Sequence, residues 1–266
     1  MAFTPIEIVF ISFIFVWIGF VRTGLGFGGA VLGLPLLMLV GGSPIDWLPI
    51  IGIHLLFFSG ISLINATKKI DWSYLRQSLP WILPAKIVGV VGLISLPPTV
   101  MIVIVYSITS FYALTWILNF QIASREGWVS RILLILGGYI SGTSLNGAPL
   151  LVAVYMQNID IKRLRNTLFV LWFLLVMIKM SAFLIVDVYI NWKFSLMLIP
   201  VAALGHFVGL KVHDQMIEND TQFKRWMGSV LILICVAGLL KVLLSLIHIS
   251  EPTTQEAIAY AVFCLK

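Results

Sequence analysis

The chain has 266 residues, of which 60% are hydrophobic and 11% are charged, with a formal net charge of +6. Its mean hydropathy is +1.06, and so much apolar surface cannot be buried in the core of a soluble domain. The composition therefore excludes a soluble domain and predicts an all-α polytopic membrane protein. A basic excess belongs to the cytoplasmic loops of such a protein and requires no nucleic-acid partner.

Ten apolar segments follow one another along the chain. They occupy residues 6–21, 30–40, 46–66, 79–96, 98–118, 132–140, 148–157, 166–186, 193–210 and 226–247. A helix needs about 20 residues to cross a bilayer, so four of these segments are short or barely adequate. The four form two pairs, 6–21 with 30–40 and 132–140 with 148–157, each joined by a Gly/Ser-rich break. Ten crossings, or six crossings with two re-entrant hairpins, both fit this pattern.

The basic residues of the loops indicate an orientation. In both arrangements one face of the membrane collects most of them: Arg22, Lys68, Lys69, Arg76, Arg125, Arg131, Lys162, Arg163, Arg165, Lys211, Lys224 and Arg225. The other face receives only Lys193, Lys241 and Lys266. Because cytoplasmic loops carry the basic excess, the N-terminus is predicted to lie outside.

The two breaks align with each other at a shift of 118 positions. The matched residues are Gly19 with Gly137, Gly24 with Gly142, Gly29 with Gly147, Ala30 with Ala148, Leu32 with Leu150 and Met38 with Met156. An odd number of crossings separates equivalent points, so two inverted repeats are predicted, over residues 1–120 and 121–249. The tail, 250–266, has no counterpart and is interpreted as a short exposed appendage or a non-native addition.

The glycine breaks predict a binding site for an anion. A membrane helix is interrupted only where protein or a water-filled cavity satisfies the freed backbone groups. The helix that follows a break presents free N–H groups and its positive dipole end, and glycine lets a ligand approach closely. The predicted substrate-binding residues are Gly24, Gly28, Gly29, Gly142, Thr143, Ser144, Asn146, Gly147 and Lys179. The alternative is that these small residues serve only to pack helices together.

Two motifs carry a family resemblance: "GLGFGGAVLGLPLL" at 24–37 and "GGYISGTSLNGAPLL" at 137–151. They resemble the TauE/SafE family of membrane transporters, also called sulfite exporters, over roughly residues 5–247. The resemblance implies transport of small sulfur-containing anions, such as sulfite, sulfonates or sulfoacetate, across a bacterial cytoplasmic (inner) membrane. The motif positions are Gly28, Gly29, Pro35, Gly142, Gly147 and Pro149. Asn146 departs from Gly28 of the first half, and Ala153 departs from Pro35.

Few other residues within the apolar segments carry charge. Lys86 and Lys179 could neutralise a bound anion, or could snorkel to the interface. His54 and His206 could bind a proton, or could form neutral hydrogen bonds between helices. All eleven carboxylates fall in loops, at segment ends or in the tail. A proton relay built on a buried Asp or Glu is therefore disfavoured, which leaves a histidine, protonation of the substrate, a sodium ion held by carbonyls, or facilitated diffusion.

The sequence shows no nucleophile with a base, no metal-ligand spacing and no phosphate loop, so neither an enzyme nor a cofactor is expected. The leading hypothesis is a secondary transporter that alternates access to an anion site between the two breaks, with a proton or sodium as possible coupling ion. A passive anion channel and a non-transporting partner subunit are the alternatives. The expected partners are the small anion and the lipid bilayer.

Overall fold

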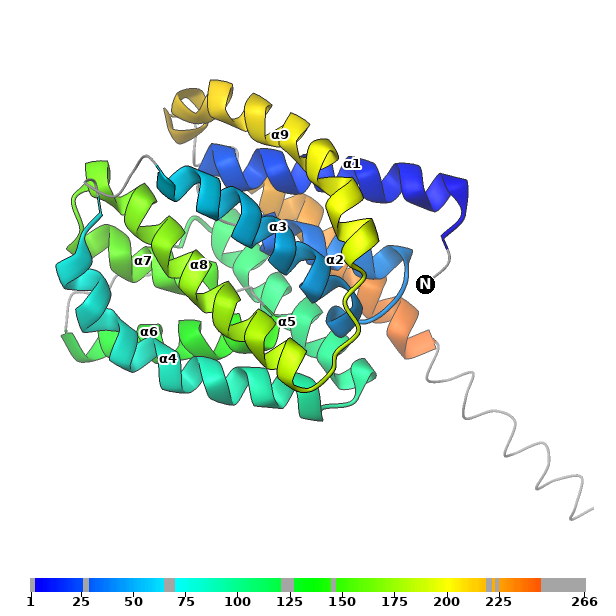
Figure 1. The fold of residues 1–266 in the computed structure, drawn as a ribbon, viewed down its shortest axis with the longest axis horizontal. Helices are drawn as coiled ribbons and strands as arrows, with labels where there is room; N and C mark the ends of the chain where they lie inside the picture. The colour runs from blue at the N-terminus through cyan, green and yellow to red at the C-terminus, as the bar shows by residue number, and fades with distance from the viewer. Residues whose placement is uncertain are drawn as a thin grey trace, which may run out of the picture.

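Residues 3–25, 29–64, 70–120, 127–144, 147–218, 222 and 225–244 are described by the computed structural model (Figure 1). These residues contain helices and no strand. The helices are α1 (Pro5–Leu25), α2 (Gly29–Val40), α3 (Pro44–Ile64), α4 (Trp72–Ser95), α5 (Pro98–Ile117), α6 (Gly127–Ser144), α7 (Ala148–Asn158), α8 (Ile161–Ile185) and α9 (Trp192–Glu218). A further helix, Arg225–Leu244, follows α9. Each predicted apolar segment coincides with one helix, which confirms the all-α fold and its ten segments. The tail, 250–266, lies outside the described residues.

Seven of the described helices are long and apolar enough to cross a bilayer, judged by length and composition. They are α1, α3, α4, α5, α8, α9 and the Arg225–Leu244 helix. By contrast, α2 has 12 residues and α7 has 11. At a rise of 1.5 Å per residue they extend only about 16–18 Å, well short of the hydrocarbon core. The short second member of each predicted pair is thus present, while α1 by itself has the length of a full crossing.

Local sequence explains where several helices begin. The backbone N–H of Thr4 donates to Oε2 of Glu7, and the N–H of Glu7 donates back to Oγ1 of Thr4, which is a capping box before α1. At the start of α4, Oδ1 of Asp71 accepts a hydrogen bond from the N–H of Tyr74. These side chains satisfy N–H groups that lack partners in the first turn of a helix.

The two halves of the chain make reciprocal contacts with each other. In the first half, α1 packs along α9 of the second half, and α4 packs along α6 (Figure 1). Both contacts are close because glycines face the partner backbone. A Cβ atom built on Gly205 would overlap the carbonyl oxygen of Val16, and one built on Gly142 would lie 2.7 Å from Cα of Gly89. If α1 is taken as equivalent to α6, and α4 as equivalent to α9, each of these two helix pairs is therefore the counterpart of the other.

The central helices α3 and α8 run antiparallel across each other (Figure 1). Gly52, early in α3, faces Met180, late in α8, whereas Gly60, late in α3, faces Phe173, which comes earlier in α8. These helices hold equivalent places in the two proposed repeats. An antiparallel pair of equivalent helices is what inverted repeats require, and the membrane orientation of each half stays a prediction.

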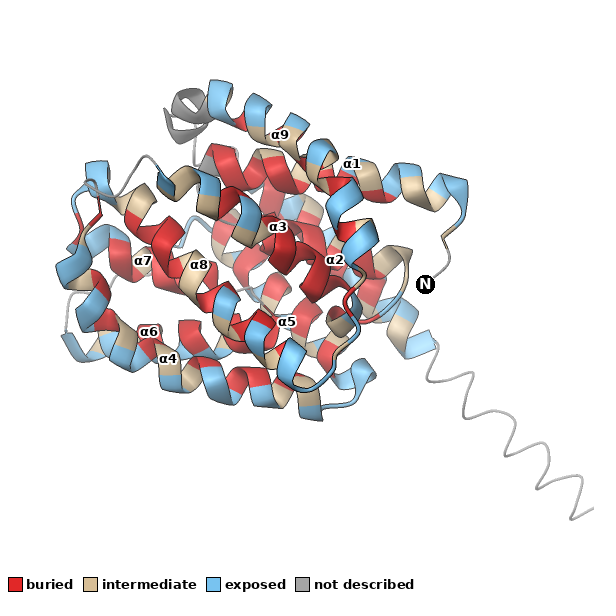
Figure 2. Ribbon diagram, in the orientation of Figure 1, coloured by how far each residue is buried: buried red, intermediate tan, exposed pale blue. Residues whose placement is uncertain are grey.

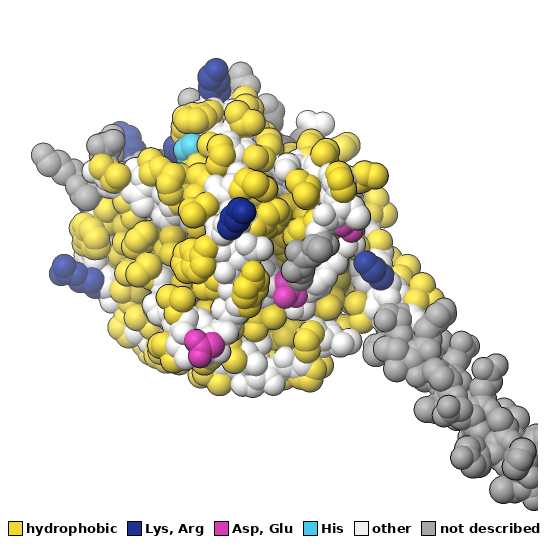
Figure 3. All heavy atoms as spheres, turned by 45° about the vertical axis from the view of Figure 1, so that its right-hand side comes forward, with side chains coloured by type: hydrophobic (Ala, Val, Ile, Leu, Met, Phe, Trp, Pro, Cys, Tyr) yellow, Lys and Arg dark blue, Asp and Glu magenta, His cyan; other side chains and the backbone are white. Residues whose placement is uncertain are grey.

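Burial follows this arrangement. Figure 2 shows buried residues along α2, α3, α7 and α8 in the interior, while α4 and α9 expose their outward faces. Figure 3 shows hydrophobic side chains over most of the visible surface, with few charged ones among them. Exposed apolar side chains on this scale are expected where lipid replaces water as the solvent.

Candidate functional site

At the first break, α1 ends at Leu25 and α2 begins at Gly29. A Cβ atom on Gly29 would lie 2.9 Å from both Cβ of Arg22 and the carbonyl oxygen of Ile18. A larger residue would push the two helices apart, so glycine is needed for the close approach of α2 to α1. This packing holds the N-terminus of α2 beside Arg22. The predicted residue Gly28 lies outside the described residues.

The second break is built in the same way. Here α6 ends at Ser144, and Gly147 caps α7 without a side-chain hydrogen bond. A Cβ atom on Gly147 would overlap the carbonyl oxygen of Gly137 and would lie 2.7 Å from the backbone nitrogen of Ser141. The N-terminus of α7 is therefore held against Ser141. Asn146 lies outside the described residues.

Arg22 is buried beside the first break, with only 5% of its surface exposed. Its Nη1 donates to the backbone oxygen of His54 at 3.4 Å, and its guanidinium carbon lies 4.2 Å from the centre of the Phe58 ring. Nη2 has no hydrogen-bond partner within the described part of the chain. The arginine is thus held by α3, while the two N–H donors of Nη2 find no partner among the described residues.

Two histidines complete this group. Nδ1 of His206 lies 2.6 Å from Oγ1 of Thr23, and the His206 ring lies 5.1 Å from the Phe58 ring. Nε2 of His54, a residue only 1% exposed, lies 2.8 Å from the backbone oxygen of Ser195. We call Arg22, Thr23, His54, Phe58 and His206 the arginine cluster; its members come from α1, α3 and α9.

A second polar group lies beside the second break. Nζ of Lys86, a fully buried residue, donates to the backbone oxygen of Ser141 at 2.7 Å and to its Oγ at 3.0 Å. Lys179 is 1% exposed and lies within electrostatic range of Lys86. Its Nζ finds no hydrogen-bond partner among the described residues. We call Lys86, Ser141 and Lys179 the lysine cluster; its members come from α4, α6 and α8.

The central contacts of the two clusters align with each other in the sequence. Trp72, Pro80, Lys86 and Gly89 of α4 align with Trp192, Pro200, His206 and Gly209 of α9, each 120 positions later. Ser141 aligns with Thr23 at the shift of 118 positions found for the breaks. The contact between Lys86 and Ser141 therefore corresponds to the contact between His206 and Thr23.

The other predicted site residues are placed as follows. Gly142 packs against Gly89 of α4, and Gly24, at the end of α1, lies near Gly209 of α9. The hydroxyls of Thr143 and Ser144 both donate to the backbone oxygen of Ile140, at 3.0 and 3.2 Å. Within α6 these hydroxyls present oxygen lone pairs rather than O–H donors. Gly142 and Gly24 thus lie in close helix contacts, which is the packing role that the alternative interpretation gives to small residues.

Lys179, the lysine predicted to bind the substrate, lies in the interior. Lys179 could have extended along its helix to the interface, but the structure buries its ammonium group. Burial without a hydrogen-bond partner among the described residues is not a snorkelling arrangement, in which the charged end reaches water.

Sequence reasoning missed Arg22 as a site residue. The predicted apolar segment ends at residue 21, so Arg22 was predicted to be one of the charges between the helices. In the structure α1 continues to Leu25, and Arg22 lies on its buried face. The signal that could have found it is its position, only two residues before the first matched glycine, Gly24.

The interior holds basic side chains without a buried carboxylate beside them in the described part of the chain. Arg22, Lys86 and Lys179 are buried, and no carboxylate is buried among the residues whose burial is described. A buried charge without a counter-charge costs several kcal/mol, roughly, even after relaxation. Arg22 near the N-terminus of α2 and Lys86, through Ser141, near that of α7 make an environment that favours an anion.

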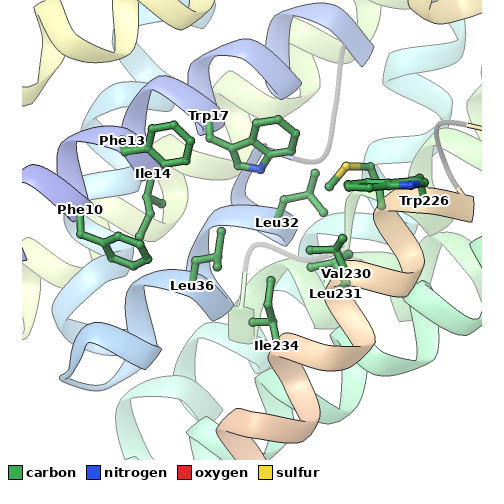
Figure 4. Close-up of a pocket in the computed structure, with 11 residues that line it drawn as sticks. Phe10, Phe13, Ile14, Trp17, Leu32, Leu36, Trp226, Val230, Leu231 and Ile234 are labelled. Carbon is green, nitrogen blue, oxygen red and sulfur yellow. The ribbon is translucent and has the colours of Figure 1, made fainter.

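An apolar groove opens between α1, α2 and the Arg225–Leu244 helix (Figure 4). Its described lining is Phe10, Phe13, Ile14, Trp17, Leu32, Leu36, Trp226, Met227, Val230, Leu231 and Ile234. None of these side chains is charged, so the groove suits a lipid acyl chain rather than an anion.

Comparison with known proteins gives one match. A family model described as sulfite exporter TauE/SafE matches residues 11–238. No curated protein and no solved structure matches the chain. The matched range contains both breaks, the arginine cluster and the lysine cluster.

Proposed function

This chain belongs to the sulfite exporter TauE/SafE family, and we propose that it is a secondary transporter of a small sulfur-containing anion, such as sulfite or a sulfonate. It is a multi-pass membrane protein, and we propose the bacterial cytoplasmic membrane as its location, with the N-terminus outside. The observation that carries the proposal is the burial of Arg22, Lys86 and Lys179 without a buried carboxylate in the described interior. A translocated anion would supply the missing negative charge.

The proposed site lies between the two clusters, where α3 crosses α8. Gly52, two residues before His54, packs against Met180, the neighbour of Lys179. This contact places the part of α3 that carries His54 beside the part of α8 that carries Lys179. Arg22 reaches the same part of α3 through its hydrogen bond to His54. An anion there would lie near the unused donors of Arg22 and Lys179.

The breaks would contribute backbone groups to this site. The N-terminus of α2 lies beside Arg22, and that of α7 lies beside Ser141, the partner of Lys86. Free N–H groups and the helix dipole favour an oxyanion at both places. The predicted residues Gly24, Gly28, Gly29, Gly142, Thr143, Ser144, Asn146 and Gly147 belong to these two regions and stay part of the proposal.

Alternating access would arise from movement of one half against the other. The pairs α1 with α9 and α4 with α6 link the halves reciprocally, so rocking about the crossing of α3 and α8 could open one cluster while it closes the other. This motion supports a carrier, which exposes its site to one side at a time, over a channel, which is open to both.

The test is flux of radiolabelled sulfite and methanesulfonate into proteoliposomes that contain the purified full chain. We expect saturable flux that is lost in the double variant Arg22→Gln/Lys179→Met. The matched control is Arg76→Gln/Lys193→Gln, which changes two exposed cations. Unsaturable flux accompanied by steady electrical current would indicate the channel instead. Absence of flux from a folded protein would contradict the proposal and favour a partner subunit.

The breaks themselves are poor places for such a test. A leucine at Gly29 or Gly147 would collide with the helix that packs against it, so transport would fail for a structural reason. Removing the buried charges changes the chemistry of the site without adding volume to a helix contact.

A further inference from the structure

We infer that the arginine cluster binds a proton together with the anion, at Nδ1 of His54, so that anion and proton cross the membrane in one step. This inference rests on the proposed function and names its coupling ion. It is carried by two unused atoms on neighbouring side chains. Nδ1 of His54 and Nη2 of Arg22 are both buried, and neither has a hydrogen-bond partner in the described part of the chain.

The protonation state of the His54 ring follows from its contact with α9. A backbone carbonyl oxygen only accepts hydrogen bonds, so Nε2, at 2.8 Å from the oxygen of Ser195, carries a hydrogen. In the neutral ring Nδ1 is then a bare acceptor. Taking up a proton makes Nδ1 a donor, and that donor needs an acceptor, which an anion provides.

Arg22 couples the two binding events. Its guanidinium donates to the backbone oxygen of His54 and lies within electrostatic range of the imidazole ring. A second positive charge on His54 is opposed by this neighbour when the site is empty, because like charges repel strongly in a dry interior. An anion held by Nη2 of Arg22 removes that opposition. Proton and anion therefore increase each other's affinity by the same factor.

The other charged and titratable groups around His54 do not replace Arg22 in this role. On α9, His206 is bonded to Thr23. On α8, Arg165 lies within electrostatic range of His206, and Lys179 lies within electrostatic range of Lys86. On α5, the hydroxyl of Tyr106 donates to the backbone oxygen of Pro35 on α2. The sequence of α2 contains no titratable side chain.

The lysine cluster offers no equivalent site. At the place of His206 it has Lys86, whose ammonium group already donates to both oxygen atoms of Ser141. Its unused atom, Nζ of Lys179, takes part in no hydrogen bond with the described residues, so no contact sets up an acceptor there as the Ser195 contact does at His54. Proton binding is therefore assigned to the first half of the chain, and the anion meets it there.

The first test uses the wild-type protein alone. Methanesulfonate is added to the purified chain in weakly buffered detergent solution, and proton uptake is followed with an indicator dye. This anion keeps its charge between about pH 5 and pH 8, the range in which histidine titrates, so it takes up no proton itself. We expect uptake approaching about one proton per bound anion near neutral pH. Binding without proton uptake throughout this range would overturn the inference.

The second test compares variants in proteoliposomes. With the acidic side outside, wild-type protein should accumulate methanesulfonate several-fold above its level without a gradient, and His54→Gln should lose this response. The matched control is His213→Gln, the same substitution one residue beyond the membrane-length part of α9. A gradient response that persists in His54→Gln would overturn the assignment. Saturable wild-type flux that does not depend on the pH gradient would overturn proton coupling but would still agree with the proposed transport function. No flux at all would refute the proposed function.

Discussion

The arginine cluster and the lysine cluster are built around aligned contacts, His206 with Thr23 and Lys86 with Ser141, yet they differ in chemistry. In the lysine cluster, Lys86 donates both to the backbone and to the side chain of Ser141. In the arginine cluster the equivalent contact joins a titratable ring, His206, to the hydroxyl of Thr23. The helix contact is thus similar in both clusters, while the lysine cluster holds two lysine side chains and the arginine cluster combines a guanidinium with two imidazoles.

Each cluster also keeps one cationic side chain with unused donors. In the arginine cluster this is Arg22, which is anchored by His54 and Phe58. In the lysine cluster it is Lys179, for which the described residues supply no hydrogen bond. The guanidinium of Arg22 therefore has a fixed direction, while no described hydrogen bond fixes the direction of the Lys179 amine. We expect the fixed one to set the geometry of the bound anion.

The largest effect is expected from Arg22→Gln. Removing one partner of a buried charge interaction typically costs on the order of 3 kcal/mol, so the ratio of maximal flux to KM should fall about a hundredfold. Arg22→Lys should recover little of it, because lysine lacks the planar fork that binds two oxygens. Initial rates of methanesulfonate uptake measure both. Full recovery in Arg22→Lys would show that only the charge matters.

Replacing the two lysines should separate their roles. Lys179→Met removes a buried charge without a described partner, so we expect flux to fall about tenfold while the Tm of the anion-free protein rises by about 2–4 °C. Lys86→Met removes two hydrogen bonds as well as a charge, so its Tm should lie below that of Lys179→Met. Thermal unfolding in detergent, without added anion, measures this order. The reverse order would mean that Lys179 has a strong partner.

Lys86→His should make the lysine cluster resemble the arginine cluster. An imidazole at this position is cationic only at acidic pH, so flux should drop several-fold at alkaline pH and recover as the pH falls. A pH profile of methanesulfonate flux, with no gradient imposed, measures the change against wild type. An unchanged profile would mean that the charge of Lys86 does not act on the anion.

The smallest effects are expected from the hydroxyls. Thr23→Val removes the group that His206 contacts and should cost about 1 kcal/mol, which corresponds to a roughly fivefold loss of flux. Ser141→Ala should cost less, because Lys86 keeps the backbone oxygen of Ser141 as an acceptor. Flux and Tm of the two variants, measured side by side, give the comparison. Equal losses would indicate that the hydroxyls are equivalent.

Much of the architecture could be predicted from the chain because its signals are local. An apolar segment must form a helix in lipid, since every backbone group has to be satisfied within the segment. The ten segments, the shortness of α2 and α7 and the family motifs all follow from residues close together in the sequence. The two breaks could be paired because Gly29 and Gly147 align in the sequence. In the structure, both glycines pack where a Cβ atom would collide with a neighbouring helix.

The composition of the site was harder to predict. Gly142 stays a predicted substrate residue, and no local pattern indicates its packing against Gly89, a contact between helices that are 53 positions apart at these residues. Arg22 was predicted to lie among the charges between the helices, because a single charged residue at the end of an apolar segment is normally exposed to solvent. Its burial depends on α3, which brings His54 and Phe58 to its guanidinium.

A helical membrane protein with two matched, glycine-broken pairs of segments could therefore be predicted from the residues alone, because hydrophobicity and backbone satisfaction act within single segments. Which polar groups meet depends instead on how distant helices pack. The packing of α1 on α9 joins Thr23 to His206, and the packing of α4 on α6 joins Lys86 to Ser141. Whether a charge in lipid has a partner depends on side chains from other helices, and no local pattern along the chain records those contacts.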